Sequence, residues 1–141
     1  MRYWVGVVSL AHTEIAVESG ICQFNHGKRA PVDRMSPGDR FVIYSPKEAI
    51  GGSEPIQAFT AIGEVLPPDV YQVEYGGFEP FRRDARYFVS SHALIRPYLE
   101  KLTFTKGRKA SWGQILRRGF FEISEEDFKL ISTAMATNFE N

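Results

Sequence analysis

The chain has 141 residues and a mass of 16.0 kDa, and its 17 basic and 17 acidic side chains give a formal net charge of zero. Hydrophobic residues make up 43% of the sequence, which is enough for a folded core and excludes a disordered tail. No apolar run reaches the length of about 20 residues that a membrane-spanning helix needs, and the first residues lack a signal-peptide pattern. A single cysteine, Cys22, excludes an internal disulfide and fits a reducing compartment. We therefore expect one cytoplasmic domain over residues 1–141, without membrane contact.

The charges are unevenly distributed along the chain. Residues 47–81 contain six acids and one base, whereas residues 82–118 contain ten bases and two acids. A neutral total can therefore hide a basic face that meets phosphates. An ordinary solvated surface would explain the same composition.

The first twenty residues predict a strand followed by a short helix. Residues 2–9 alternate two apolar sets, which indicates a strand buried on both faces. Ser9 is placed to cap a helix over residues 10–19, in which Ile15 faces inward. Gly20 is typical of a residue that ends a helix in a left-handed turn.

Two apolar runs, residues 21–24 and 41–44, flank a polar segment rich in turn residues. Within it, Pro37-Gly38-Asp39 predicts a tight turn that leads into a strand over residues 40–45. Alternation divides this strand between two faces, Val42 and Tyr44 against Phe41 and Ile43. Amide, imidazole and cationic side chains crowd the end of the earlier run beside Phe24, which suits a planar polar ligand: Gln23, Asn25, His26, Lys28 and Arg29.

The remaining elements are predicted from hydrophobic periodicity and from the positions of glycine, proline and other turn residues. Strands are expected over residues 56–66, 70–75 (weaker), 82–90 and 120–123, loops over 47–55 and 103–112, and a short helix or turn over 95–102. Ser124 then caps the best-specified helix, in which Phe128, Ile131 and Met135 share one face. Five to six strands with few helices predict an α+β fold, a strongly curved mixed sheet or small barrel with flanking helices.

Catalytic and metal signals are weak. The histidines lie far apart, with no metal-binding spacing, so no metal is expected, and no fingerprint of a cofactor is present. Cys22 and His26 suggest a thiol nucleophile with its base, but residues four apart on a strand are about 13 Å apart unless a turn intervenes. A buried cysteine that lines the interior explains Cys22 as well. We therefore expect no enzymatic activity.

Recognition signals are stronger. Trp112 lies among Lys106, Arg108 and Lys109, a composition typical of a base-stacking aromatic flanked by phosphate contacts. The same tryptophan could equally anchor the loop to the core. Arg117 and Arg118 either reach phosphates or lie on a solvated edge.

Seven motifs together resemble an EVE domain, over nearly the whole chain: YWVGVVS (3–9), GICQFNHGK (20–28), MSPGD (35–39), VIYSP (42–46), QAFTAIG (57–63), PFRRD (80–84) and FFEISEED (120–127). The resemblance implies the PUA-like fold, a curved sheet or pseudo-barrel with flanking helices, shared with the YTH domains that bind methylated adenine in RNA. It also implies a non-enzymatic reader of modified bases in DNA or RNA, above all modified cytosines.

Carried onto this sequence, the resemblance implies a base pocket made by Ser9, Cys22, Gln23, Phe24, Tyr44, Ser45, Trp112 and Arg118. The cations expected to hold phosphates are Lys28, Arg82, Arg83, Lys106, Arg108, Lys109 and Arg117. Ile21 stands where relatives commonly have an aromatic side chain. The expected partner is therefore a modified nucleic acid, with no cofactor and no metal. The alternatives are a small-molecule sensor of a nucleobase or nucleoside and, less favoured, a Cys22-dependent enzyme.

Overall fold

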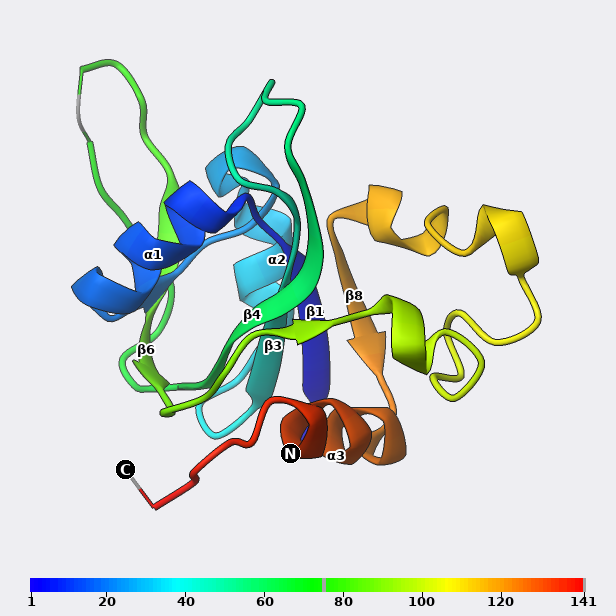
Figure 1. Cartoon of the computed structure of the whole chain (residues 1–141). Coiled ribbons are helices and arrows are strands. Elements are labelled where there is room, and N and C mark those ends of the chain that lie inside the picture. Colours follow the sequence, from blue (N-terminus) through cyan, green and yellow to red (C-terminus); the bar gives the residue numbers. More distant parts are fainter. Residues whose placement is uncertain (75, 141) are drawn as a thin grey trace.

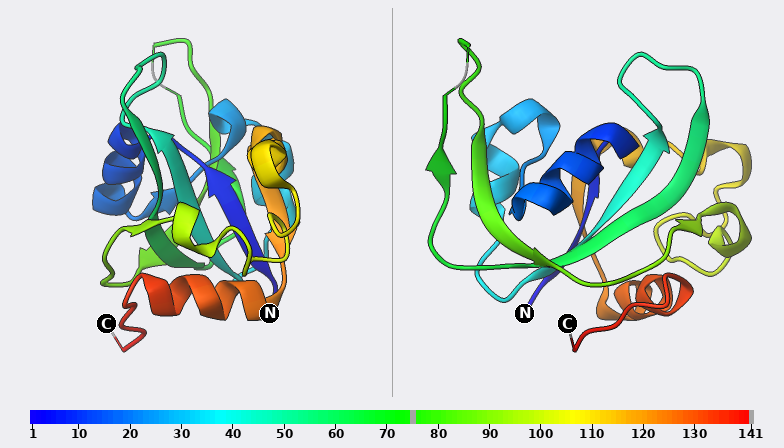
Figure 2. Two further views of the ribbon diagram at one scale, coloured as in Figure 1. Left: turned by 45° about the vertical axis from the view of Figure 1, so that its right-hand side comes forward. Right: turned by 60° about the vertical axis from the view of Figure 1, so that its left-hand side comes forward.

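A mixed and strongly curled β-sheet is the frame of the molecule, shown by a computed structural model that describes residues 1–74 and 76–140 (Figures 1 and 2). Its strands are β1 (Tyr3–Val7), β2 (Ile21–Cys22), β3 (Arg40–Lys47), β4 (Pro55–Val65), β5 (Tyr71–Gln72), β6 (Phe81–Tyr87), β7 (Ala93–Leu94) and β8 (Phe120–Ile123). The order across the sheet is β2-β6-β4-β3-β1-β8, with β5 beside β6 and β7 beside β4. The pair β1–β3 is parallel and the other strand pairs described are antiparallel.

The helices are short and connect or cover the strands. They are α1 (Leu10–Ser19), α2 (Arg29–Arg34), α3 (Glu125–Ala134) and the 3₁₀ turns η1 (Asn25–Gly27), η2 (Arg96–Tyr98), η3 (Lys109–Ser111) and η4 (Ile115–Arg118). In the right-hand view of Figure 2, α1 lies inside the curl of the sheet and α3 lies against its outer side. None of the helices in the described ranges is long and apolar enough to cross a membrane.

Both faces of the central strands are buried, as the apolar alternation of residues 2–9 and 40–45 predicts. One apolar cluster contains Val42 and Tyr44 of β3 together with Phe128 and Ile131 of α3. The second cluster, on the opposite face, contains Phe41 and Ile43 with Trp4, Phe24 and Phe120. The fold therefore follows the expected α+β class, with a strongly curved mixed sheet and flanking helices.

Helix ends agree with the local signals in the sequence. The Ser9 hydroxyl accepts the amide proton of His12, and Gly20 ends α1 with φ of 68°. The Ser124 hydroxyl accepts the amide proton of Asp127 at 3.1 Å and starts α3. The prediction for Ile15 was wrong, because α1 packs inward through the small residues Thr13 and Ala16 and leaves Ile15 exposed.

The segment 96–118 forms turns and short 3₁₀ helices, among them η2 in the stretch 95–102 where a short helix or turn is expected and η3 at the end of the loop expected over 103–112. Contacts with the rest of the protein hold this segment. Tyr98, Leu102 and Leu116 pack with the first cluster. The backbone amide of Thr103 donates to the buried Asp127 carboxylate of α3 at 3.0 Å. The weak strand expected over 70–75 is shorter, as β5 (Tyr71–Gln72), and Tyr75 lies outside the described residues.

Candidate functional site

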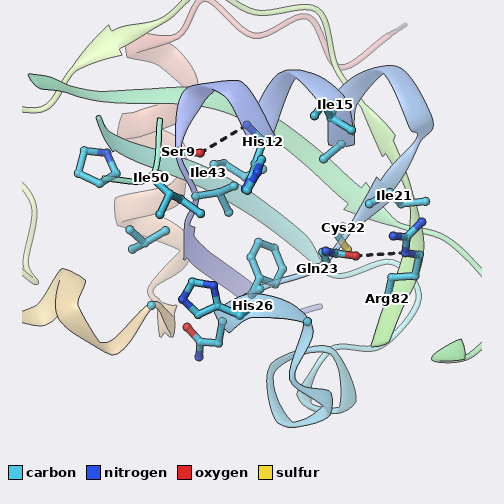
Figure 3. A pocket seen from close by; sticks show the side chains of 18 of the residues that line it. Ser9, His12, Ile15, Ile21, Cys22, Gln23, His26, Ile43, Ile50 and Arg82 are labelled. Carbon is cyan, nitrogen blue, oxygen red and sulfur yellow. Dashed lines mark hydrogen bonds between the residues drawn. The ribbon is translucent and has the colours of Figure 1, made fainter. Parts of the chain in front are cut away.

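A cavity of about 580 Å³ opens between α1, the segment 21–27, the loop after β3 and the end of η4 (Figure 3). Its floor is the ring of Phe24, which is 1% exposed and stacks on Phe120 with ring centroids 5.0 Å apart. Phe24 fits there because Gly6 has no side chain: a Cβ on residue 6 would overlap the phenyl ring. The aromatic floor thus depends on a glycine in β1.

The lining of the cavity is mostly apolar, with a smaller number of polar groups. Val8, Ile21 and Ile43 line the walls, as does Tyr87, whose hydroxyl donates to the Ile21 carbonyl at 2.8 Å. Figure 3 shows two imidazoles, of His12 on α1 and His26 on η1, on opposite sides of the opening. A concave, mostly apolar space with a few polar groups is the usual form of a small-ligand site.

A left-handed turn shapes one side of the opening. Asn25, His26 and Gly27 have φ angles of 49°, 59° and 81°, a rare succession for residues with side chains. Asn25 packs directly against Gly119, where a Cβ would overlap the amide oxygen, and its Nδ2 donates to the Arg118 carbonyl at 3.5 Å. The turn is therefore held by a segment more than ninety residues away in the sequence.

Four of the predicted base-pocket residues line this cavity: Ser9, Cys22, Gln23 and Phe24. Tyr44, Ser45, Trp112 and Arg118 lie outside its lining. Tyr44 belongs to the opposite apolar cluster and packs edge-on against Phe59. The expectation that Phe24, Tyr44 and Trp112 form one aromatic-walled slot was therefore wrong, because alternation along β3 sends Tyr44 to the other face of the sheet.

Of the other three side chains outside the lining, Arg118 is exposed, and Ser45 and Trp112 have structural partners. The Ser45 hydroxyl is fully buried and lies 2.7 Å from the Thr60 hydroxyl. Trp112 packs against the first cluster. The Arg96 guanidinium carbon lies over the Trp112 ring, 5.4 Å from the ring centroid. Anchoring of the loop, the second of the two interpretations of Trp112, is thus what its contacts show.

Cys22 and His26 both line the cavity, because the intervening turn brings them to one site. Burial is the main cause that raises the pKa of the Cys22 thiol to about 12, and the positive charge of Arg83 only partly offsets it. A thiol with this pKa is protonated near neutral pH, whereas a nucleophilic cysteine needs a thiolate. Within the described ranges, no group of three His, Cys, Asp or Glu side chains is arranged to hold a metal ion.

The cations predicted to hold phosphates fall into three groups. Lys28, Lys106, Arg108, Lys109 and Arg117 are exposed, and Arg117 lines the cavity. Arg82 also lines it, but its Nε donates to Gln23 Oε1 at 3.1 Å. The prediction for Arg83 was wrong: its side chain is buried and donates to the carbonyls of Val32 and Met35, both at 2.9 Å, and to Asp69.

Several lining residues were not in the predicted pocket. His12 lies one helical turn after Ser9, so a pocket at Ser9 would have suggested it. Ile43 alternates with Tyr44 along β3, and Tyr87 reaches the cavity from β6. No signal in the sequence identifies Tyr87, because β6 approaches the segment 21–24 only through the pairing of β2 with β6.

Comparison with known proteins identifies the family to which the chain belongs. The profile of the EVE domain matches residues 2–134, and the chain belongs to that family. A UPF0310 protein of Mesorhizobium japonicum is 48% identical over 94% of this chain and 91% of its own length. A UPF0310 protein of Renibacterium salmoninarum is 42% identical over 96% of both chains.

Solved structures with low sequence identity share the fold. The crystal structure of a Pseudomonas syringae protein has a TM-score of 0.62 at 14% identity, covering 93% of this chain and 97% of that one. The NMR structure of a Rhodopseudomonas palustris protein has a TM-score of 0.59 at 15% identity, covering 96% and 94%. At this identity the likeness concerns the fold alone.

Proposed function

We propose that this EVE domain is a non-catalytic module that binds a nucleic acid and reads one of its bases, a modified cytosine above all, in the cavity beside Gln23. The observation that carries the proposal is the cavity itself, an apolar space of about 580 Å³ with an aromatic floor and with Gln23 and Arg117 at its sides. Its size lies within the range of about 300–1,000 Å³ found for small-ligand sites. Membership of the EVE family supports the same function.

The physical logic follows from the surfaces that a base presents. A flipped or single-stranded base offers apolar faces to Phe24, Ile43 and Val8, and a polar edge to the amide of Gln23. A methyl group on the base would be recognised by apolar contact, worth about 0.8 kcal/mol for each buried carbon. Exposed cations outside the cavity would hold the flanking phosphates.

Fluorescence anisotropy with labelled single-stranded DNA and RNA that differ at one central base tests this proposal. We expect binding at low salt, weaker binding at moderate salt, and tighter binding of one modified cytosine than of cytosine. Ala49→Phe, which adds a ring to the cavity lining from the exposed loop after β3, should remove the preference, whereas Ala110→Phe on the exposed segment 109–111 should not. Thermal melts test whether both variants fold. No binding of any oligonucleotide at low salt would overturn the proposal.

A sensor of a free nucleobase or nucleoside is the second candidate, favoured by the location of the cations. Of the exposed cations in the segment 96–118, only Arg117 lines the cavity. This candidate predicts saturable binding of a free nucleoside in calorimetry, with little dependence on salt. Oligonucleotide binding that depends steeply on salt would favour the reader instead.

A further inference from the structure

The amide of Gln23 has its orientation fixed by Arg82, and this fixes what the cavity offers to a ligand. An arginine Nε–H can only donate, so the atom of Gln23 that lies 3.1 Å from it is the amide oxygen Oε1. The amide nitrogen Nε2 is then on the other side of the group, and Figure 3 shows it toward the interior of the cavity. Gln23 therefore presents two N–H donors to whatever occupies the space.

Some of the other polar side chains of the cavity reinforce this bias toward donors, whereas His12, Asn25 and His26, which also line it, can both donate and accept. Lys47 and Arg117 carry only donors, and among the described residues that line the cavity none is Asp or Glu. The Ser9 hydroxyl oxygen already accepts from the His12 amide, so the hydroxyl proton remains to be donated. A ligand edge rich in donors would leave these groups unsatisfied, which costs binding free energy.

We infer that Gln23 is a specificity-determining residue that donates to a hydrogen-bond acceptor on the bound base, a carbonyl oxygen or ring nitrogen, and that Arg82 is its positioning residue. This inference rests on the proposed function, since it concerns a base in the same cavity. It also gives Arg82 a role different from phosphate binding. The O2 and N3 edge of cytosine is one such acceptor edge, and the carbonyls of uracil and thymine are others.

Gln23→Glu tests the donor directly, because it replaces Nε2 by an oxygen and keeps the shape of the side chain. The contact with Arg82 is preserved, as a carboxylate also accepts from the guanidinium, so the variant is expected to fold. With the oligonucleotide that wild type prefers, we expect at least about tenfold weaker binding. Gln23→Glu binding as tightly as wild type would overturn the inference while the proposed function stands. Wild type that binds no oligonucleotide would instead contradict the proposed function.

Arg82→Ala separates a positioning role from a phosphate contact. Without Arg82 the amide can turn over and offer its oxygen, so the preference of the protein for its favoured base should fall severalfold, with little change in salt dependence. A phosphate contact predicts the reverse: an unchanged preference and a lower slope of log K against log salt. Arg86→Ala is the matched control, because it removes the same charge four residues along β6 and lies outside the lining of the cavity. A preference that survives Arg82→Ala would overturn the positioning role.

Discussion

Residue 6 shows how one missing side chain positions the candidate site. Gly6 is paired on both sides, with Ile43 of β3 and Phe120 of β8, so its backbone cannot easily move. The Phe24 ring occupies the space over it and packs between Phe120 and Phe41, with centroid distances of 5.0 and 5.9 Å. The floor of the cavity thus depends on a close contact between a ring and a main chain.

Gly6→Ala is expected to destabilise the protein by about 1–3 kcal/mol, because the new methyl group overlaps the Phe24 ring, which is packed against Phe120 and Phe41. Chemical denaturation measures the change. Gly113→Ala is the control, since a Cβ there meets no atom within 4 Å. Equal stability of Gly6→Ala and wild type would show that Phe24 can move aside at no cost.

Cys22 offers a test of its protonation state. The thiol is 1% exposed, and burial raises its pKa to about 12. At pH 8 we therefore expect iodoacetamide to label native Cys22 at least about a hundredfold more slowly than the unfolded chain, in which a cysteine has its ordinary pKa of about 8.5. Mass spectrometry after timed exposure, with and without denaturant, measures the two rates. Rapid labelling of the folded protein would contradict the raised pKa and would favour the Cys22-dependent enzyme.

The limits of sequence reasoning at this scale are visible in Tyr44 and Phe24. Alternation places Tyr44 and Ile43 on opposite faces of β3, and the structure confirms that division. The sequence does not say on which face Phe24 packs, because that depends on the contact of residue 24 with Gly6, far earlier in the chain. Four of the eight predicted pocket residues consequently line the cavity. They are Ser9, at the start of α1, and Cys22, Gln23 and Phe24, in the segment 21–27.

At the scale of the elements, α3 holds the segment 96–118 in place. The Asp127 carboxylate is 2% exposed and accepts from both the backbone amide and the hydroxyl of Thr103. Hydrogen bonds to a charged group are worth about 1.5–3 kcal/mol. This contact links a well-formed helix to a segment that has only short turns of its own.

Asp127→Ala is expected to lower the free energy of unfolding by about 2 kcal/mol, because the Thr103 amide and hydroxyl lose their acceptor. Urea denaturation gives the value. Glu126→Ala removes an exposed acid in the same helical turn and should change stability by less than about 0.5 kcal/mol. Similar losses for the two variants would mean that charge in the first turn of α3, and not the Thr103 contact, is what matters.

Elements with local signals were predictable and elements made by pairing were not. Ser9, Gly20 and Ser124 mark the helix ends through contacts within four residues, and all three were placed correctly. β2 and β7 are two residues long and exist only because β6 and β4 pair with them. The inward face of α1 was also not predicted. Hydrophobicity favours Ile15 as the inward residue, but the small residues Thr13 and Ala16 are the ones that are buried.

At the scale of the whole molecule, the cavity joins parts that are distant in the sequence. Its lining includes residues of β1, α1, the segment 21–27, the end of β3, β6 and η4 (Figures 1 and 3). The curl of the sheet brings these segments together, and the Asn25–Arg118 hydrogen bond connects residues 93 positions apart. The family and the fold were accessible from ordered motifs, whereas the shape of the site depends on these non-local contacts.

The distribution of charge over the molecule leads to the final prediction. Exposed Lys109 lies on η3 and Arg117 on η4 at the cavity, whereas exposed Arg86 lies on β6, on the opposite side of the molecule in Figure 1. If the segment 96–118 holds the phosphates of a single strand, removing one phosphate-binding cation should reduce the slope of log K against log salt by about 0.7. Lys109→Ala and Arg117→Ala are therefore expected to lower the slope, and Arg86→Ala to leave it unchanged.

The two variants should differ in a second measurement. Arg117 lines the cavity and Lys109 does not, so Arg117→Ala should also weaken binding of a free nucleotide, while Lys109→Ala should affect only oligonucleotides. Titrations at several salt concentrations and with a mononucleotide give both quantities. If all three variants keep the slope of wild type, the excess of bases between residues 82 and 118 is an ordinary solvated surface, and the ligand of the cavity is a small molecule with no phosphate chain attached.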